Sequence, residues 1–354
     1  MFGHTPNIHS KSEADTLVEQ VIQEASKTFI PGMRNSDKLF FKMVLRPGSR
    51  SYPDPHFRSD ANNIPHSNLV ASMGPQFADM ANFFLDTAFN PTKPIEKIVA
   101  LCDPTTIHTT DTADSMLEGD CYDYFLTSRE VEINDFSFKI KRLAGHMTTE
   151  EAKDTIPAGL IQSELEIKTK LPSEPEKNSS KKLQVTFFEI TDGNAITLNH
   201  DYQKQIVWDL NVYAQSHPIL VHCRSGIGRT GNFIFMLEIL KDYDTVFASQ
   251  HPKTIAENIH AILKRLRTVR PALVLAPEQF ASAIRNARIL HNFALGKGYV
   301  NQAEKTAISP LKRPAEPPKT AENGQEAASS SANPSKASGS DQETVESDKK
   351  PKLR

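Results

Sequence analysis

The segment PILVHCRSGIGRTG, from Pro218 to Gly231, limits what this chain can fold into more than any other part of it. It contains a short apolar run, which predicts a buried strand at Ile219–His222. A strongly apolar helix is predicted to follow at Thr230–Tyr243. Gly226 and Gly228 lie between them, and a residue without a Cβ lets the backbone curl tightly. We therefore predict a strand–loop–helix unit whose loop turns successive N–H groups toward one point.

A curled loop of this kind is a cradle for a phosphate group, because its N–H groups and the start of the following helix carry partial positive charge. The cradle is predicted to comprise Arg224, Ser225, Gly226, Ile227, Gly228 and Arg229. Arg229 has a planar fork of donors that holds two phosphate oxygens at once. The same field favours a thiolate at Cys223, since nearby cations and helix N-termini lower a cysteine pKa from ~8.5 to ~3.5–7.5. We predict that Cys223 attacks phosphorus and that water then hydrolyses the phosphocysteine.

Two neighbours of the loop are assigned supporting roles. Thr230 is expected to donate its hydroxyl to the sulfur and help it leave in the second step. His222 is expected to order the loop through hydrogen bonds, not to act as the base. The chain has no H-E-x-x-H, no paired C-x-x-C and no G-x-x-x-x-G-K-[ST]. The sequence therefore predicts a phosphomonoester hydrolase that uses no metal and no cofactor.

The residues quoted above resemble a known family. VHCRSGIGRTG looks like the active-site signature of the protein tyrosine phosphatases. Downstream, LRTVRPALVLAPEQF is similar to the family segment in which an arginine-proline pair precedes a glutamine loop, and this resemblance implies that Gln279 positions the hydrolytic water. Upstream, Asn68–Phe84 resembles the strand and helix around the family's Q-G-P, and CYDYF resembles its C-x-Y-W strand, with Tyr124 and Phe125 in the aromatic places. The implied fold is α/β, with a central twisted mixed sheet flanked by helices.

The resemblance also implies a general acid on a mobile loop about thirty residues before the cysteine. Asp192 occupies that place, and a positioned acid of this kind contributes ~10²–10⁴ in rate. The family's Trp-Pro is replaced here by Ile190 and Thr191, although Gly193 and Asn194 suit a mobile loop. The alternative is that Asp192 is an ordinary turn residue.

The sequence leaves three hypotheses open about what the phosphate cradle binds. The first is phosphotyrosine in a protein, as the resemblance implies. The second is an inositol phosphate or phosphoinositide, because the chain lacks the family's Asn-Arg-Tyr and Arg224 adds a second positive charge to the loop. Tyr52 is the nearest candidate for the missing stacking tyrosine. The third is a phosphopeptide-binding module that keeps the cradle but turns over poorly, because the segment around Asp192 departs from the family pattern.

The amino-acid composition limits which partners the protein binds and which cellular compartment it occupies. The formal net charge is -2, which argues against general nucleic-acid binding. Three cysteines, an odd and sparse set, do not form a disulfide framework and favour a reducing compartment such as the cytoplasm. We expect no signal peptide and no membrane span. The chain also resembles stand-alone phosphatase domains that bacteria deliver into host cells. This resemblance implies a bacterial effector as one alternative.

Apolar periodicity and composition divide the chain. We expect a flexible N-terminus at 1–11, one phosphatase domain at 12–296 and a low-complexity disordered tail at 297–354, which is rich in Pro, Ser and Ala. Further helices are predicted at Asp15–Phe29, Gln76–Phe89, Tyr202–Ala214, Thr254–Thr268 and Pro277–Phe293. Further strands are predicted at Ile95–Leu101, Asp135–Leu143, Leu160–Leu171 and Leu183–Ile190. Pro172–Ser180 is predicted to be a turn, and Asn35–Pro75 to be rich in loops.

Overall fold

A computed structural model describes part of the chain. The described residues are 11–31, 56–103, 107–108, 121–126, 128–133, 136–143, 160–170, 178–190 and 195–300. The chain divides into two units, Met1–Thr306 and Ala307–Arg354, and every described residue belongs to the first. The predictions made for Tyr52, Asp192 and the tail after Val300 lie outside the described residues. The domain boundaries therefore stay predictions.

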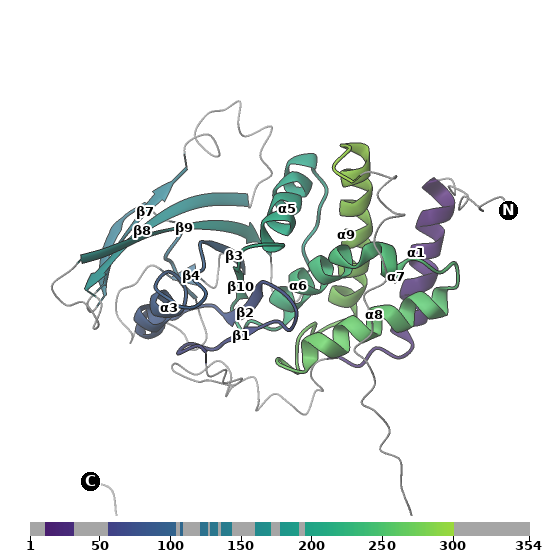
Figure 1. The fold of residues 1–354 in the computed structure, drawn as a ribbon, viewed down its shortest axis with the longest axis horizontal. Coiled ribbons are helices and arrows are strands. Elements are labelled where there is room, and N and C mark those ends of the chain that lie inside the picture. Colours follow the sequence, from purple (N-terminus) through teal and green to yellow (C-terminus); the bar gives the residue numbers. More distant parts are fainter. Residues whose placement is uncertain are drawn as a thin grey trace, which may run out of the picture. The chain divides into compact units, whose positions relative to one another are not determined.

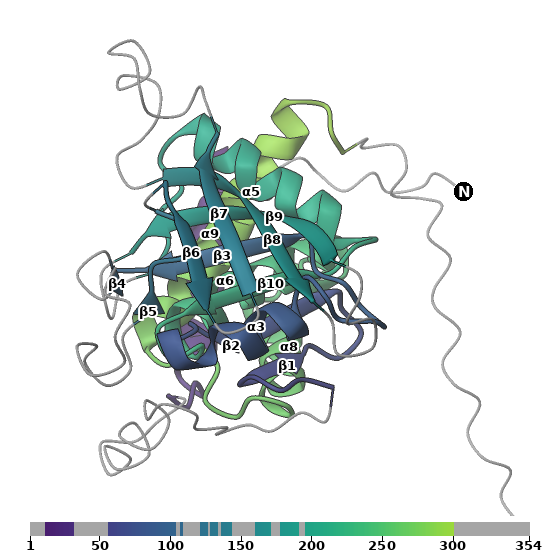
Figure 2. The ribbon, with the colours of Figure 1, turned by 90° about the vertical axis from the view of Figure 1, so that its left-hand side faces the viewer.

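A mixed sheet forms the centre of the first unit (Figures 1 and 2). Its strand order is β1-β2-β10-β3-β9-β8-β7-β6. The strands are β1 Ala61–Asn63, β2 Leu69–Met73, β3 Lys97–Cys102, β6 Glu130–Ile133, β7 Phe136–Arg142, β8 Leu160–Lys170, β9 Asn178–Glu189 and β10 Ile219–Cys223. The neighbours β2, β10, β3 and β9 run parallel, whereas β1 and the strands from β9 to β6 pair antiparallel. The predicted class, a mixed sheet flanked by helices, is confirmed.

Helices cover both faces of this sheet. They are α1 Lys11–Ser26, α3 Met80–Asp86, α5 Asp201–Ala214, α6 Gly228–Lys241, α7 Tyr243–Val246, α8 Pro252–Arg267 and α9 Pro277–Gly296, and a short 3-10 turn, η2, spans Phe77–Asp79. α6 lies against β10 and packs against α8 and α9, and α5 packs against α9 (Figure 1). Among the described residues, no helix is long and apolar enough to span a bilayer.

The central strand β10 is buried on both faces, which explains its continuous apolar sequence. Ile219 and Val221 belong to the core under α6, α8 and α9. Leu220 belongs to the opposite core, which contains Phe83 and Phe84 of α3. Successive side chains of a strand point to opposite faces, so this one strand contributes side chains to two hydrophobic cores. This double burial holds the end of β10, where the loop begins.

The structure differs from the sequence prediction in the bounds and pairing of several elements. The predicted helix Gln76–Phe89 is the turn η2 followed by the shorter α3, and β6 and α7 were not predicted. Asn178–Ser180 was predicted as part of a turn but belongs to β9 and pairs with the end of β8, because backbone pairing continues past the last apolar residue. β1 lies inside the stretch predicted to be loop-rich, since its sequence ANN carries no apolar alternation. Cys121–Tyr122 forms β5, which pairs with β4 (Ile107–His108) outside the central sheet.

Candidate active site

The predicted loop lies at the carboxyl edge of the parallel strands. β10 ends at Cys223, and α6 begins at Gly228. Parallel strands place their carboxyl ends at one edge, which is where α/β folds bind ligands. Cys223 is in register with Met73 of β2, and Ile190 directly follows β9 at the same edge. The predicted strand–loop–helix unit is therefore present, and its loop meets the ends of the neighbouring strands.

Gly226 gives the loop its curvature. Its φ is +67°, in the left-handed region that residues with a Cβ rarely adopt. A Cβ at this position would lie 2.2 Å from the carbonyl oxygen of Ser72 in β2. The loop is thus pressed against the neighbouring strand, and glycine is required there for both reasons.

The sulfur of Cys223 lies inside the curled loop. The residue is 1% exposed, and the backbone N–H of Gly226 donates to its Sγ at 3.2 Å. The first turn of α6 follows immediately, so the helix N-terminus lies close to the sulfur. An N–H donor and a helix dipole both stabilise negative charge on sulfur. The loop therefore places a hydrogen-bond donor and a helix N-terminus beside the sulfur.

Arg229 is buried in the first turn of α6. Its Nη1 donates to the carbonyl oxygen of Ile190 at 2.7 Å. This contact ties the arginine to the chain at the point where the segment containing Asp192 begins. Asp192 itself lies outside the described residues.

Gln279 approaches the loop from the start of α9. A Cβ on Gly228 would lie 2.9 Å from its Nε2, so the carboxamide packs directly on the loop. Its Oε1 accepts the N–H groups of Leu275 and Ala276 at 3.1 and 3.3 Å, which holds the side chain in this place. The structure thus brings Gln279 beside the loop, and the water-positioning role that the resemblance implies stays a prediction.

The remaining predicted loop residues take different environments. Thr230 is fully buried, and its hydroxyl makes no hydrogen bond to the described residues, the sulfur of Cys223 included. Arg224 is half-buried, and its carbonyl oxygen accepts the N–H of Gly74 at 3.2 Å, which ties the loop to the end of β2. Ser225 is nearly buried, and Ile227 is fully buried.

Arg270 is a site residue whose role the sequence analysis missed. It is 0% exposed, and it donates from Nε to the carbonyl oxygen of Gly226 at 2.8 Å and from Nη2 to that of Ser225 at 3.3 Å. Its Nη1 pairs with Asp60 at 3.0 Å and with Asn62 at 2.6 Å. One buried guanidinium therefore holds the carbonyls of Ser225 and Gly226, while the N–H of Gly226 donates to the Cys223 sulfur inside the loop. The arginine-proline pair at 270–271 was the available signal.

His222 lies directly beneath the loop in a fully buried network. Its Nε2 is 2.6 Å from the hydroxyl of Tyr124, and burial raises the pKa of that tyrosine well above its usual value. Hydrogen bonding from Cys121, and then from His222, lowers the pKa of the neighbouring Cys102 thiol to about 5 against the effect of burial. The same pairing with Cys102, together with burial, raises the pKa of Cys121. The structure is consistent with the ordering role predicted for His222.

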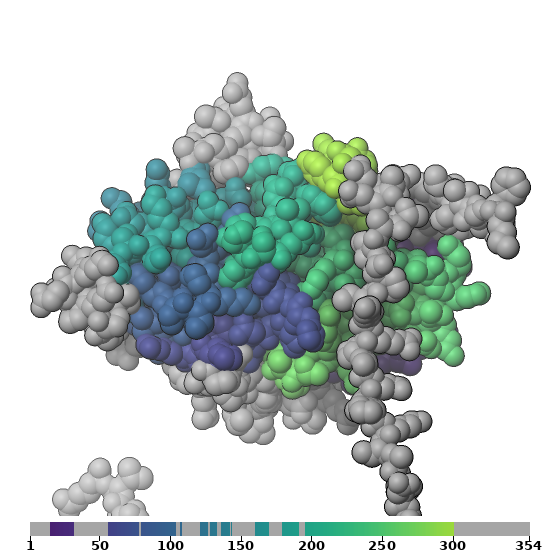
Figure 3. Space-filling view, viewed as in Figure 1, coloured from purple at the N-terminus to yellow at the C-terminus, as the bar shows by residue number. Residues whose placement is uncertain are grey.

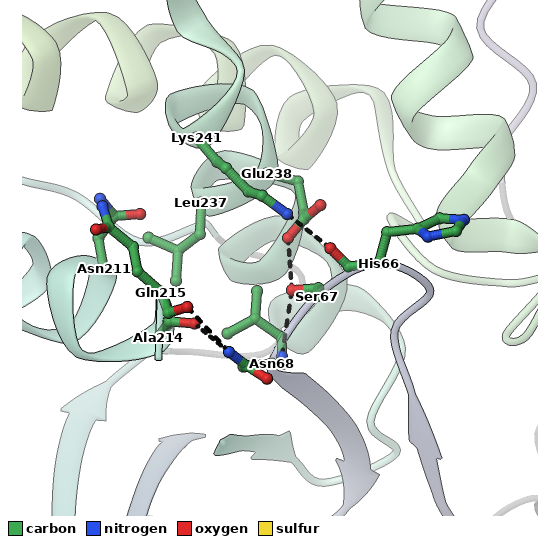
Figure 4. A pocket seen from close by; sticks show the side chains of 10 residues that line it. His66, Ser67, Asn68, Asn211, Ala214, Gln215, Leu237, Glu238 and Lys241 are labelled. Atoms are coloured by element: carbon green, nitrogen blue, oxygen red, sulfur yellow. Dashed lines mark hydrogen bonds between the residues drawn. The ribbon is translucent and has the colours of Figure 1, made fainter. Parts of the chain in front are cut away.

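A separate cavity of about 410 Å³ lies at the other end of α6 (Figure 4). Leu237, Glu238 and Lys241 of α6 line it together with the turn before β2 and the end of α5. Asn68 donates to the carbonyl oxygens of Ala214 and Gln215, which joins that turn to α5, and the two segments lie side by side on the molecular surface (Figure 3). β2 begins at this cavity and ends at the loop, so the cavity is not part of the candidate active site.

Three comparisons show which known proteins this chain resembles. A sequence model of the family described as protein-tyrosine phosphatase matches residues 98–287, more than half of the chain. The human receptor-type tyrosine-protein phosphatase zeta is 38% identical over 71 residues, which are 19% of this chain and 3% of that protein. A solved PTPN18 structure, described as the basis of its fingerprint on distinct HER2 tyrosine phosphorylation sites, is 14% identical with a TM-score of 0.45. It covers 67% of this chain and 74% of that one.

Proposed function

Because this chain belongs to the protein-tyrosine phosphatase family, we propose that it hydrolyses phosphotyrosine in proteins through a phosphocysteine on Cys223. One observation carries the proposal most directly. The N–H of Gly226 points at a buried sulfur, in a loop that opens into the N-terminus of α6. A converging N–H donor and a helix N-terminus are the groups that bind an anionic phosphate.

The first step forms the covalent intermediate. The Cys223 thiolate attacks phosphorus, a P–S bond forms and the P–O bond to the tyrosyl oxygen breaks. The N–H groups of the loop and the fork of Arg229 neutralise the charge on the transferred phosphoryl oxygens. Asp192 gives its proton to the leaving oxygen, and only two peptide units separate it from Ile190, which binds Arg229.

The second step releases phosphate. Water attacks phosphorus, the P–S bond breaks and the sulfur leaves as a thiolate. Asp192 takes the proton from that water, and Gln279, packed on Gly228, orients it. Thr230 is proposed to donate to the departing sulfur. Its buried hydroxyl has no other partner among the described residues, so it is available for this bond once its rotamer changes.

Cys223→Ser tests the nucleophile. We expect phosphate release from a phosphotyrosyl peptide to fall by on the order of 10⁴-fold or more, because the residual catalysis comes from binding alone. Folding is checked by circular dichroism. Asp192→Asn should lower kcat most on a substrate with a poor leaving group. If wild type and Cys223→Ser released phosphate equally from every substrate, the proposal would be wrong.

An inositol phosphate or phosphoinositide substrate is a second candidate, favoured by the half-buried charge of Arg224 in the loop. A panel of phosphotyrosyl peptides, phosphoseryl peptides and inositol phosphates separates it from the first. We expect the highest kcat/KM on phosphotyrosyl peptides. The inositol phosphate candidate would be favoured instead if Arg224→Ala lost activity on inositol phosphates alone. Tight peptide binding without turnover would favour a phosphopeptide-binding module.

We also propose a reducing compartment, the cytoplasm of the producing cell or of a host that it enters. All three cysteines are free and buried, and Cys223 must stay reduced to act. Fractionation of producing and recipient cells, with a tagged full chain, tests this proposal. Recovery from an oxidising compartment alone would contradict it.

A further inference from the structure

Three metal-ligating side chains lie together behind the phosphate loop, and the proposed chemistry uses none of their free ligand atoms. Cys102 ends β3, Cys121 begins β5 and His222 lies in β10. The two sulfurs and one ring nitrogen all lie within 4.8 Å of one another, and all three residues are fully buried. Both cysteines are free. Two sulfur atoms and one nitrogen therefore surround a common point.

The fold builds this cluster from three separate strands. His222 is in register with Ala100 of β3, and Cys102 lies two residues further toward the carboxyl edge, on the same face as Ala100. β5 is joined to this edge by the N–H of Tyr122, which donates to the carbonyl oxygen of Pro75 at 2.9 Å. The three ligands are thus held by backbone pairing and not by a flexible loop.

Gly74 keeps the space beside the cluster open. A Cβ at this position would lie 3.0 Å from Sγ of Cys121 and 3.2 Å from Nδ1 of His222. It would also lie 2.6 Å from the carbonyl oxygen of Cys223, so no larger residue fits there. Nδ1 and the Cys121 sulfur therefore border the same small space, and no side chain at position 74 fills it.

Both ring nitrogens of His222 have a polar neighbour. The hydroxyl of Tyr124 contacts Nε2 at 2.6 Å, whereas Nδ1 lies 3.4 Å from the carbonyl oxygen of Cys223. The short contact at Nε2 fixes the ring, and a metal ion at Nδ1 would replace the longer contact there. The rings of Phe83, Tyr124 and Phe125 lie 5.8 to 6.4 Å from the imidazole, centroid to centroid. This apolar shell excludes water, and a dry site with sulfur ligands disfavours hard cations such as Mg²⁺.

We propose that Cys102, Cys121 and His222 bind one thiophilic metal ion, Zn²⁺ or Cu⁺. Thiolates and imidazole are the ligands that select these two ions. Both cysteines bind as thiolates, any thiol proton still present passes to solvent, and no oxidation is involved. Zn²⁺ would cancel the charge of two buried thiolates, whereas Cu⁺ accepts three ligands without a fourth. The sequence showed no metal spacing, because the ligands come from three strands.

The test uses the full chain carrying Cys223→Ser, which removes the thiol of the loop. The protein is refolded from urea under reductant, so that burial does not bar entry, with Co²⁺, Zn²⁺ or Cu⁺ supplied separately. We expect one equivalent of metal by mass spectrometry and thiolate-to-cobalt absorption with Co²⁺. Competition between Zn²⁺ and Cu⁺ for the cobalt-loaded protein decides which ion binds more tightly.

Variants locate the site. We expect Cys102→Ser and Cys121→Ser to weaken binding by on the order of 100-fold or more, because loss of an outer-shell partner alone costs ~10–100-fold. Tyr124→Phe, which removes only an outer-shell partner, should weaken metal binding within that ~10–100-fold range. His217→Ala removes an exposed imidazole elsewhere and should bind as the parent does. Equal affinity in the parent and both cysteine variants would overturn the proposal.

X-ray absorption at the metal edge needs no further variant. The loaded Cys223→Ser protein should show two sulfur neighbours at about 2.3 Å and one nitrogen at about 2.0–2.1 Å for Zn²⁺. A shell of oxygen and nitrogen alone, or no metal uptake under reductant, would show that no such site forms. Because the parent of this test is inactive by design, the result does not depend on the proposed phosphatase activity.

Discussion

Each end of α6 carries a buried charged residue, Arg229 at the start and Glu238 near the end, yet the polar groups around them are arranged differently. At its C-terminal end, Glu238 accepts from Ser67 at 2.7 Å and from Arg265 at 2.7 Å, and Lys241 donates to the carbonyl oxygen of His66 (Figure 4). At its N-terminal end, the N–H of Gly226 donates to the sulfur of Cys223, and the hydroxyl of Thr230 finds no partner among the described residues.

The difference distinguishes buried polar groups that stabilise the fold from buried polar groups that are placed to bind a ligand. A buried charge that the chain itself satisfies holds segments together, as Glu238 does for the β2 turn and α8. Donors that converge on an open point stabilise a group that arrives from outside. Arg270 belongs to the first kind although it lies beside the loop, because it binds the outer carbonyls of Ser225 and Gly226 and pairs with Asp60.

The largest expected effect is that of Gly226→Ala at the N-terminal end. The new Cβ would meet the Ser72 carbonyl at 2.2 Å and force the loop away from β2. We expect kcat/KM on a phosphotyrosyl peptide to fall by on the order of 10²-fold or more, since a small misplacement of reacting groups costs that much. A discontinuous phosphate-release assay on wild type and variant measures this change in kcat/KM.

Two other glycines provide matched controls for that change. Gly298 has a φ of +71° but nothing within 4 Å of its Cβ position, so Gly298→Ala carries only the conformational cost of about 1–2 kcal/mol. Gly296→Ala meets neither constraint. Both should keep wild-type kcat/KM. If Gly226→Ala behaved like Gly298→Ala, contact with β2 would not shape the loop.

Arg270→Lys sharpens the comparison by keeping the charge and removing the fork. A lysine cannot reach Asp60, Asn62 and both loop carbonyls at once. We expect kcat to fall by about 10- to 100-fold, by misplacement of the loop, with a smaller change in KM. Arg265→Lys is the matched change at the other end of α6 and should leave kcat unchanged. Equal kcat in the two variants would remove Arg270 from the positioning of the loop.

The smallest expected effect is a pH dependence at the C-terminal end. Burial raises the pKa of Glu238 above its usual value of 4.5, against the lowering effects of Ser67, Lys241 and Arg265. The folded state therefore holds this proton more tightly than the unfolded state, and stability falls as pH rises from the unfolded pKa through the folded one. Glu238→Gln removes that dependence.

Urea unfolding at several pH values from 4 upward measures this difference. The free energy of unfolding of wild type should decline relative to Glu238→Gln across that window, while kcat/KM at neutral pH is the same for both folded proteins. Parallel pH profiles of stability would show that the ion pair with Arg265 fully compensates the burial of the carboxylate.

Much of the fold was predictable from local patterns. The apolar run of β10, the glycines of the loop and the helix after Thr230 are consecutive, so short-range sterics and periodicity suffice to predict them. The ends of elements were less predictable. β1 carries no apolar alternation, and the start of β9 is polar, so the tertiary pairing of backbones set both.

The sequence by itself determined the phosphate loop, because curvature, charge and nucleophile all lie within the stretch from Ile219 to Gly231. Only the tertiary structure decided that Arg270 restrains that loop and that Cys102 and Cys121 meet His222. These contacts join residues far apart in the chain. The order and register of the strands set the distances between them, and no local pattern encodes that order.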